Sequence, residues 1–293
     1  MRAFEIPEEG KNSKGRAIQN LLNVDKDNKV ITVLNVRDLK DEEFINNHYV
    51  ILCTKKGVIK KTTLEAYSRP RKAGINAITI REGDELLTAN MTSGEDEVVM
   101  ALRSGKAVRF NEKTVRPMGR NASGVKGITL ASEHDEVIGM ICIHDPEQTV
   151  LVVSEKGFGK RSGIDDYRIT NRGTKGVKTL NITEKTGDLI AIKDVTDEDD
   201  LIIINKSGIL IRIGADTLRV MGRATQGVKL IDLRGNDEIA AVTKVKREDE
   251  DEEEVQYDED GNPIVVEPVE GETPEILEQD LIDSSEVQNP TEE

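Results

Sequence analysis

The stretch Gly124-Val125-Lys126-Gly127-Ile128 decides the fold, because variants of it recur along the chain. The other copies are Gly15-Arg16-Ala17-Ile18, Gly74-Ile75-Asn76-Ala77-Ile78, Gly176-Val177-Lys178-Thr179-Leu180 and Gly227-Val228-Lys229-Leu230-Ile231. Their first glycines, called the repeat glycines below, are 59, 50, 52 and 51 residues apart. Self-similarity at a fixed period near fifty residues indicates a repeat architecture.

A second signal keeps register with the first. An apolar segment, a glycine turn and a basic segment precede the last four copies, at residues 49–61, 98–109, 150–161 and 201–212. The turn glycines lie 17, 19, 19 and 19 residues before the next repeat glycine; they are Gly57, Gly105, Gly157 and Gly208. Two signals locked together over four units predict repeated supersecondary units.

Each unit is predicted to consist of short strands. Residues 86–90, 98–103 and 107–110 are rich in β-formers and too short for helices, and the glycine turns suit hairpins because glycine tolerates positive φ. Aromatic residues make up only 3% and Trp is absent, so Val, Ile and Leu must build the core. We therefore predict an all-β, propeller-like disk of four-stranded blades over residues 1–246, with about five recognisable repeats and a partial first blade.

The net charge of -15 is an average over two unlike segments. Residues 248–293 hold 20 of the 56 acidic residues and no Lys or Arg, so 36 acidic and 41 basic residues leave the remainder at +5. Like charges and little apolar surface predict that residues 247–293 form a disordered acidic tail. The tail is expected either to solubilise the protein or to compete with a polyanion for the basic body.

Basic residues recur with the repeat. A cation stands four residues after each turn glycine, and further cations flank the repeat glycines. Such a belt is expected to neutralise phosphates and bind duplex DNA without reading its sequence. The alternative is that these charges only discourage pairing of strand edges. The predicted DNA contacts are Lys11, Lys14, Arg16, Lys60, Lys61, Arg69, Arg71, Arg109, Arg116, Arg120, Lys126, Lys160, Arg161, Arg168, Arg172, Lys178, Arg212, Arg219, Arg223 and Lys229.

Other classes of function find little support. The histidines, His48, His134 and His144, lack metal-ligand spacing, and the two cysteines are expected to be buried thiols in a reducing cytoplasm. We expect no catalytic residue, metal or cofactor in this chain. No stretch approaches the ~18 apolar residues of a membrane span. A protein-binding propeller stays open as an alternative, although it would repeat apolar or aromatic residues where this sequence repeats Arg.

Residues 116–128 and 218–229 resemble the blade-joining loops in the C-terminal domain of the DNA gyrase A subunit, and residues 92–98 and 14–22 are further matches. The resemblance covers roughly residues 1–246. It implies a β-pinwheel, in which blades exchange strands and a basic rim wraps DNA with fixed handedness. It also implies double-stranded DNA, the gyrase A breakage-reunion region and the gyrase B subunit as partners in an ATP-dependent type II topoisomerase that introduces negative supercoils.

The chain departs from the whole family protein in two respects. The breakage-reunion region with its catalytic Tyr is absent, and so is the Gln-Arg-Arg-Gly-Gly-type box of the family's first blade. Residues 1–6 are interpreted as the last part of that blade. The C-terminal domain of the topoisomerase IV A-type subunit is the alternative within the class, although its fewer and more degenerate repeats fit five copies less well.

Overall fold

The structure, a computed structural model, describes residues 5–8, 13, 14, 16, 17, 21, 22, 29–71 and 74–247. Within these ranges the chain forms three four-stranded sheets and one three-stranded sheet, which we call blades A to D in chain order. Residues 248–293 of the predicted acidic tail lie outside the described residues, as do Gly15 and Ile18 of the first repeat, whereas Arg247 is described and bonds to Asp200 and Asp216. The all-β prediction is confirmed.

Each blade is an antiparallel sheet in which the first strand lies between the second and the third. Strand order within the blades is β3-β1-β2, β7-β4-β5, β11-β8-β9 and β15-β12-β13. Successive strand bounds are β1 Tyr49–Thr54, β2 Val58–Thr63, β3 Leu86–Thr92, β4 Glu97–Leu102, β5 Lys106–Asn111, β7 Val137–Ile143, β8 Thr149–Ser154, β9 Phe158–Gly163, β11 Leu189–Val195, β12 Asp199–Asn205, β13 Leu210–Gly214 and β15 Ile239–Lys246.

The hairpin between the first two strands of each blade turns at the predicted glycine. Gly57, Gly105, Gly157 and Gly208 have φ values of 81°, 77°, 79° and 89°, which a residue with a Cβ adopts only at a cost. The recurring sequence pattern of an apolar segment, a glycine and a basic segment therefore corresponds to this hairpin.

Blades A to C receive their fourth strand from a later part of the chain. The short strands β6 (Val125–Lys126), β10 (Val177–Lys178) and β14 (Val228–Lys229) pair with β2, β5 and β9. All three strands belong to the recurring glycine motif at residues 124–128, 176–180 and 227–231. The repeat motif is thus the exchanged strand of a β-pinwheel. No described strand pairs with the outer edge of β13 in blade D.

Short helical turns complete the units. A 3-10 turn follows the second strand of every blade: η3 (Leu64–Tyr67), η4 (Glu112–Thr114), η5 (Ile164–Asp166) and η6 (Ala215–Thr217). One α-helix, α1 (Glu42–Asn47), precedes β1 in the described part of the chain, and the Asp41 side chain caps it by accepting a hydrogen bond from Phe44 N at 3.0 Å.

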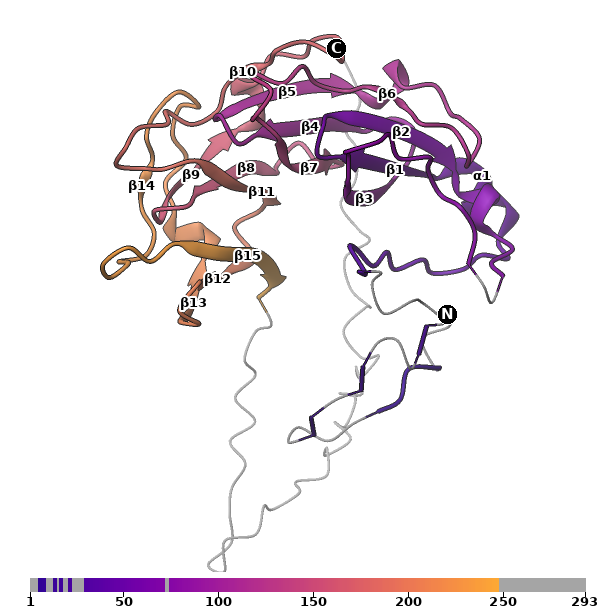
Figure 1. Cartoon of the computed structure of the whole chain (residues 1–293), viewed down its shortest axis with the longest axis horizontal. Helices are drawn as coiled ribbons and strands as arrows, with labels where there is room; N and C mark the ends of the chain where they lie inside the picture. The colour runs from indigo at the N-terminus through magenta and orange to yellow at the C-terminus, as the bar shows by residue number, and fades with distance from the viewer. Residues whose placement is uncertain are drawn as a thin grey trace, which may run out of the picture. The chain divides into compact units, whose positions relative to one another are not determined.

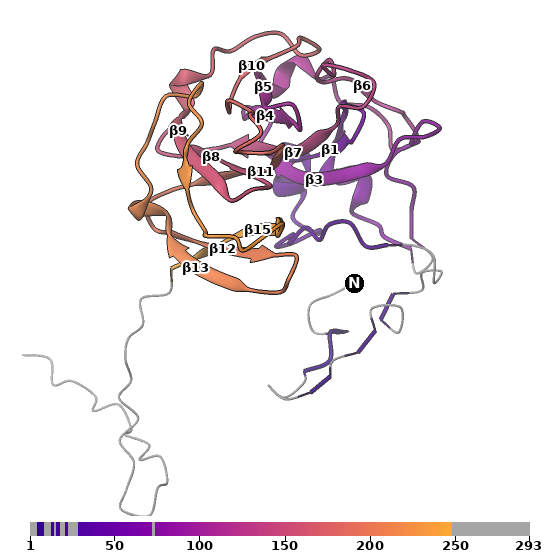
Figure 2. The ribbon, with the colours of Figure 1, turned by 60° about the vertical axis from the view of Figure 1, so that its left-hand side comes forward.

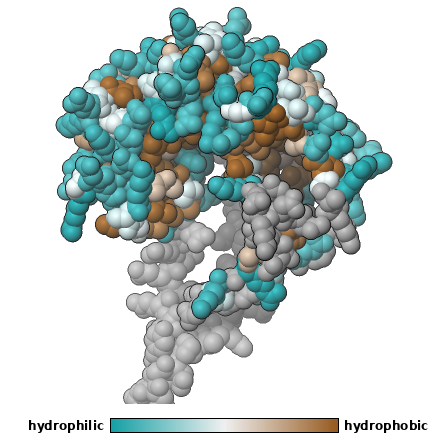
Figure 3. Space-filling model, viewed as in Figure 1, coloured by the Kyte–Doolittle hydropathy of each residue, from teal (hydrophilic) through white to brown (hydrophobic). Residues whose placement is uncertain are grey.

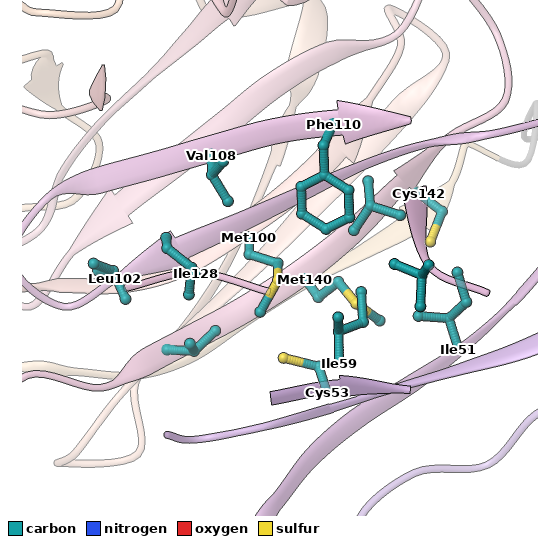
Figure 4. Close-up of a cluster of buried hydrophobic side chains, with 13 residues drawn as sticks. Ile51, Cys53, Ile59, Met100, Leu102, Val108, Phe110, Ile128, Met140 and Cys142 are labelled. Carbon is teal, nitrogen blue, oxygen red and sulfur yellow. The ribbon is translucent and has the colours of Figure 1, made fainter. Parts of the chain in front are cut away.

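The core lies between neighbouring blades. Ile51 and Ile59 of blade A pack with Met100 and Phe110 of blade B in one buried cluster (Figure 4). Similar clusters join blade B to blade C and blade C to blade D. The strands β3, β7, β11 and β15 contact one another in series, so the blades stand around a common centre (Figures 1 and 2). Hydrophilic residues cover most of the outer margin in Figure 3.

Candidate nucleic-acid interface

Three loops join successive blades along their outer edges; they span residues 116–126, 168–178 and 219–229, and we call them the rim loops. Each rim loop begins and ends on the outer edge of the preceding blade. It enters through a parallel bridge, such as Lys61 with Pro117, and leaves through the exchanged strand. The backbone of each loop is therefore fixed at both ends on the same strand.

The repeat glycines are required by this close approach. Gly124 has a φ of 87°, and a Cβ there would lie 2.6 Å from the Ile59 carbonyl oxygen of β2. A Cβ at Gly176 would collide with the carbonyl of Ala107, and one at Gly227 with the carbonyl of Gly159. The recurring glycine thus lets the exchanged strand lie against its host strand.

The cations four residues after the turn glycines lie mainly inside the fold. Lys61 forms a buried ion pair with Glu112 at 2.7 Å, and its ammonium also lies 4.1 Å from the centre of the Tyr49 ring. Arg109 donates to the carbonyls of Ile164 at 2.7 Å and Tyr167 at 3.0 Å.

Blade C repeats this arrangement, because Arg161 donates to the Ala215 carbonyl at 2.8 Å. In each case a cation on the second strand of one blade reaches the 3-10 turn of the next unit. We call Lys61, Arg109 and Arg161 the interblade cations. Arg212 of blade D is more exposed and bonds to Asp200 of its own blade at 2.7 Å. The sequence pattern assigned all four positions to the DNA-binding belt, but the interblade cations are engaged in contacts within the protein, and only Arg212 is exposed.

Lys60 and Lys160 are also buried, contrary to the surface position expected for them. The Lys60 ammonium donates to the carbonyls of Ala77 and Arg120, and that of Lys160 donates to the Gly222 carbonyl at 2.6 Å. Burial lowers the pKa of each lysine to about 8. Both lysines therefore hold the backbone of a rim loop by hydrogen bonds, and their buried ammonium groups are not accessible to phosphate.

A second set of arginines ties the rim loops to one another. Arg172 donates through Nη1 to the carbonyl of Lys126 in the preceding loop at 3.0 Å. Arg223 repeats this contact with the carbonyl of Lys178 at 2.8 Å. Arg120, at the equivalent place in the first rim loop, is partly exposed, and its carbonyl accepts the bond from Lys60. The rim loops are therefore linked in series.

The remaining predicted contacts stand on the surface. Every rim loop presents an exposed Arg at its entrance and an exposed Lys in its exchanged strand. These residues are Arg116, Lys126, Arg168, Lys178, Arg219 and Lys229. Lys178 bonds to Asn181 at 3.2 Å and Lys229 pairs with Asp232, contacts that leave the lysines accessible. Arg69 and Arg71 are exposed in the loop of blade A, and Lys14 and Arg16 are exposed near the N-terminus, whereas Lys11 lies outside the described residues.

Sequence reasoning missed Lys175. This residue lines a surface hollow of about 190 Å³ in the second rim loop, together with Arg168, the hydroxyl-bearing Thr170 and Thr174, and residues 107–109 of β5. The other rim loops have Ser123 and Gln226 at this place, so periodicity could not reveal it. The sequence did offer one signal, because Lys175 is a basic residue without a counterpart in the other rim loops and lies three residues after the repeated Arg172.

The described residues contain no group of three or more His, Cys, Asp or Glu side chains arranged to hold a metal ion. Cys53 and Cys142 are buried free thiols, and burial raises the pKa of Cys142 to about 12. No described helix has the length and apolar character to cross a membrane. The cationic rim is consequently the most developed candidate site in this part of the chain.

Strand exchange between blades and a series of linked cationic loops define the class of protein, a pinwheel of the type found in type IIA topoisomerases. A family model described as "DNA gyrase C-terminal domain, beta-propeller" matches residues 48–93, 96–144, 148–196 and 199–246, one match for each blade. The chain belongs to this family, which confirms the resemblance seen in its rim loops.

Individual relatives agree. The DNA gyrase A subunit of Staphylococcus aureus (strain NCTC 8325 / PS 47) is 41% identical over 253 residues, which cover 86% of this chain and 28% of the relative. The chain thus spans little more than a quarter of the curated relatives it matches. A solved DNA gyrase A C-terminal domain has a TM-score of 0.70 at 25% identity, covering 83% of this chain and 77% of that one. A topoisomerase IV C-terminal domain, at 24% identity, shares the fold with a TM-score of 0.72 over 79% of this chain and 71% of that one.

Proposed function

We propose that the rim loops bind duplex DNA through its phosphates and bend it around the outer edge of the blades. The observation that carries this proposal is the serial linkage of the loops by Arg172 and Arg223, each loop presenting an exposed Arg and an exposed Lys. Cations at repeated positions on a fixed scaffold match a polyanion with regularly spaced charges. They contact phosphate, so the binding is independent of sequence.

The hollow around Lys175 supports the same function. Three cationic residues (Arg109, Arg168 and Lys175), two threonines and Gly176 line it, which is the chemistry that receives a phosphate group. We assign it as the strongest single phosphate contact of the rim. The first and third rim loops lack this lysine, and each contacts phosphate through its entrance arginine and the lysine of its exchanged strand.

In a complete enzyme, the bent duplex would be presented to a breakage-reunion region and a gyrase B subunit, and strand passage would then introduce negative supercoils in the cytoplasm. The full-length relatives, which are gyrase A subunits, favour this role over a topoisomerase IV role. The number of cationic rim loops supports extended wrapping, because each loop adds a contact to offset the elastic cost of bending.

The test replaces Lys126, Lys178 and Lys229 together by Ala in the whole chain and measures affinity for duplex DNA across a range of salt concentrations. Each lost phosphate contact lowers the slope of log K against log salt by about 0.9, so the slope should fall by roughly 2.7. The matched control replaces Lys56, Lys156 and Lys206 by Ala; these lysines are exposed beside the hairpin turns and outside the rim loops.

The control variant should keep the original slope. An equal loss of slope in both variants would show that the rim lysines contribute no more than any other surface lysines. A salt-independent affinity in the unmodified chain would rule out the electrostatic mechanism. Wrapping is read separately, from the linking number of nicked and religated circles bound by the chain.

A further inference from the structure

Each rim loop carries an exposed apolar residue directly after its entrance arginine. These residues are Pro117, Ile169 and Val220, and each lies seven residues before its repeat glycine. Ile169 is 57% exposed and Val220 is 56% exposed. Isolated apolar residues on a surface need no explanation, but three at the same place in successive units do.

The fold holds these side chains outward. Pro117, Ile169 and Val220 are the residues that form the parallel bridges to the preceding blade. The residue after each one donates its N–H to the same host strand, as Met118 N does to the Lys61 carbonyl at 2.8 Å. Met118 packs onto the core between blades A and B, and successive side chains of an extended segment point to opposite faces. The apolar side chain therefore points away from the core, and in the chain it directly follows the exposed arginine.

The surroundings indicate what covers these side chains. Each is a single apolar group beside an exposed Arg, in a loop that also presents an exposed Lys. Proteins that bind the minor groove and bend DNA place apolar side chains against its base steps and use basic residues in the same groove. A deoxyribose offers an apolar face that is the same in every sequence. A protein partner would call for one contiguous apolar patch instead of one small group per blade.

We propose that Pro117, Ile169 and Val220 pack against the deoxyribose edges of bound duplex DNA and set its position and bend on each blade. This inference rests on the proposed function and adds an apolar contact to the electrostatic one. The two contacts have different signatures. Loss of a phosphate contact changes the salt slope, whereas loss of an apolar contact releases no counterions and lowers affinity equally at every salt concentration.

The experiment compares the whole chain with a triple variant, Pro117→Ser, Ile169→Thr and Val220→Thr. Threonine keeps the β-branched shape that suits these bridged positions. Affinity for a duplex long enough to span the rim loops is measured over a range of salt, and bending is measured by energy transfer between labelled duplex ends. The expected result is affinity roughly tenfold weaker at all salt concentrations, an unchanged slope and a smaller bend.

The control is Val33→Thr, which alters an apolar residue that is 81% exposed and lies outside the rim loops. It should leave affinity and bending unchanged, and unaltered thermal melts should show that both variants are folded. Unchanged affinity and bending in the triple variant would overturn the inference, and so would a reduced slope, which would mean that the phosphate contacts had been disturbed. A failure of the unmodified chain to bind duplex DNA would instead count against the proposed function.

Discussion

The interblade cations and the cations of the rim loops recur with the same period, yet the fold uses them in opposite ways. Lys61 is buried against Glu112 and joins two blades, whereas Lys126, on the strand that pairs beside it, is exposed. Both positions look like one basic belt in the sequence. The difference teaches that periodic charge reports a repeated environment, which a repeat protein supplies equally at its surface and between its units.

Removing the charge of an interblade cation should have the largest effect on stability. Lys61→Ala leaves the Glu112 carboxylate buried without its cationic partner, which should cost about 3–5 kcal/mol of unfolding free energy. Urea denaturation measures this loss. Lys126→Ala is the matched control and should leave stability within about 0.5 kcal/mol of the original. Equal stability of the two variants would contradict the division between the two sets.

The repeat glycines provide the next test, because they seat the rim loops on the blades. Gly176→Ala places a Cβ against the Ala107 carbonyl and forces a residue with a Cβ into a φ of 69°, so we expect a loss of about 2–3 kcal/mol in thermal unfolding. Gly222→Ala is the control, since a Cβ there meets nothing within 4 Å. A stability loss at Gly222 as large as that at Gly176 would show that loop glycines matter for some other reason.

A smaller effect is expected where rim loops are tied together. Arg172→Ala removes hydrogen bonds to the carbonyls of Thr114 and Lys126 and should cost about 1 kcal/mol of stability. Faster amide exchange in residues 116–126 should accompany the change, because the second loop no longer restrains the first. Arg168→Ala, at the loop entrance, should weaken DNA binding without this change in exchange. Identical exchange patterns in the two variants would mean that the loops are not coupled through Arg172.

The smallest effect concerns the buried lysine beneath the third rim loop. Burial lowers the pKa of Lys160 to about 8 from its ordinary 10.5, so above pH 8 the folded protein has lost a proton that the unfolded chain still holds. The contribution of Lys160 to stability should therefore rise with pH, by somewhat under 1 kcal/mol between about pH 7.5 and 8.5. Denaturation of the original protein and of Lys160→Met at each pH isolates this contribution. A difference that stays constant or falls with pH would contradict it.

Much of the fold follows from the sequence because local rules decide it. The turn at Gly105 and the strands around it are set by backbone conformation and β-propensity within a few residues. The exchanged strand was visible as a motif, although its pairing with the preceding blade required the three-dimensional structure or the family resemblance. The short helix α1 was not predicted, even though Asp41 supplies a recognisable cap.

The candidate site was only half predictable. The partners that bury Arg109 are carbonyls 55 and 58 residues further along the chain, and no local pattern reveals such acceptors. For Lys175 the difficulty was the reverse, because a search for recurring positions discards a cation that occurs in one loop. Physical context separates the cases. A cation within a strand that has neighbours on both sides meets protein, whereas a cation in a loop on a strand edge meets solvent.

Strand exchange has a consequence for how proteins of this design can gain or lose length. Blade A is completed by β6 from the next unit, so no blade corresponds to one continuous segment. Removing residues 49–92 would delete β1, β2 and β3 and leave β6 without the strand β2 with which it pairs. Removing residues 124–175, from one repeat glycine to just before the next, would instead bring Gly176-Val177-Lys178 to the place of Gly124-Val125-Lys126. A clean duplication or deletion must therefore span one whole period of the repeat, so that every host strand still meets an exchanged strand from the following unit.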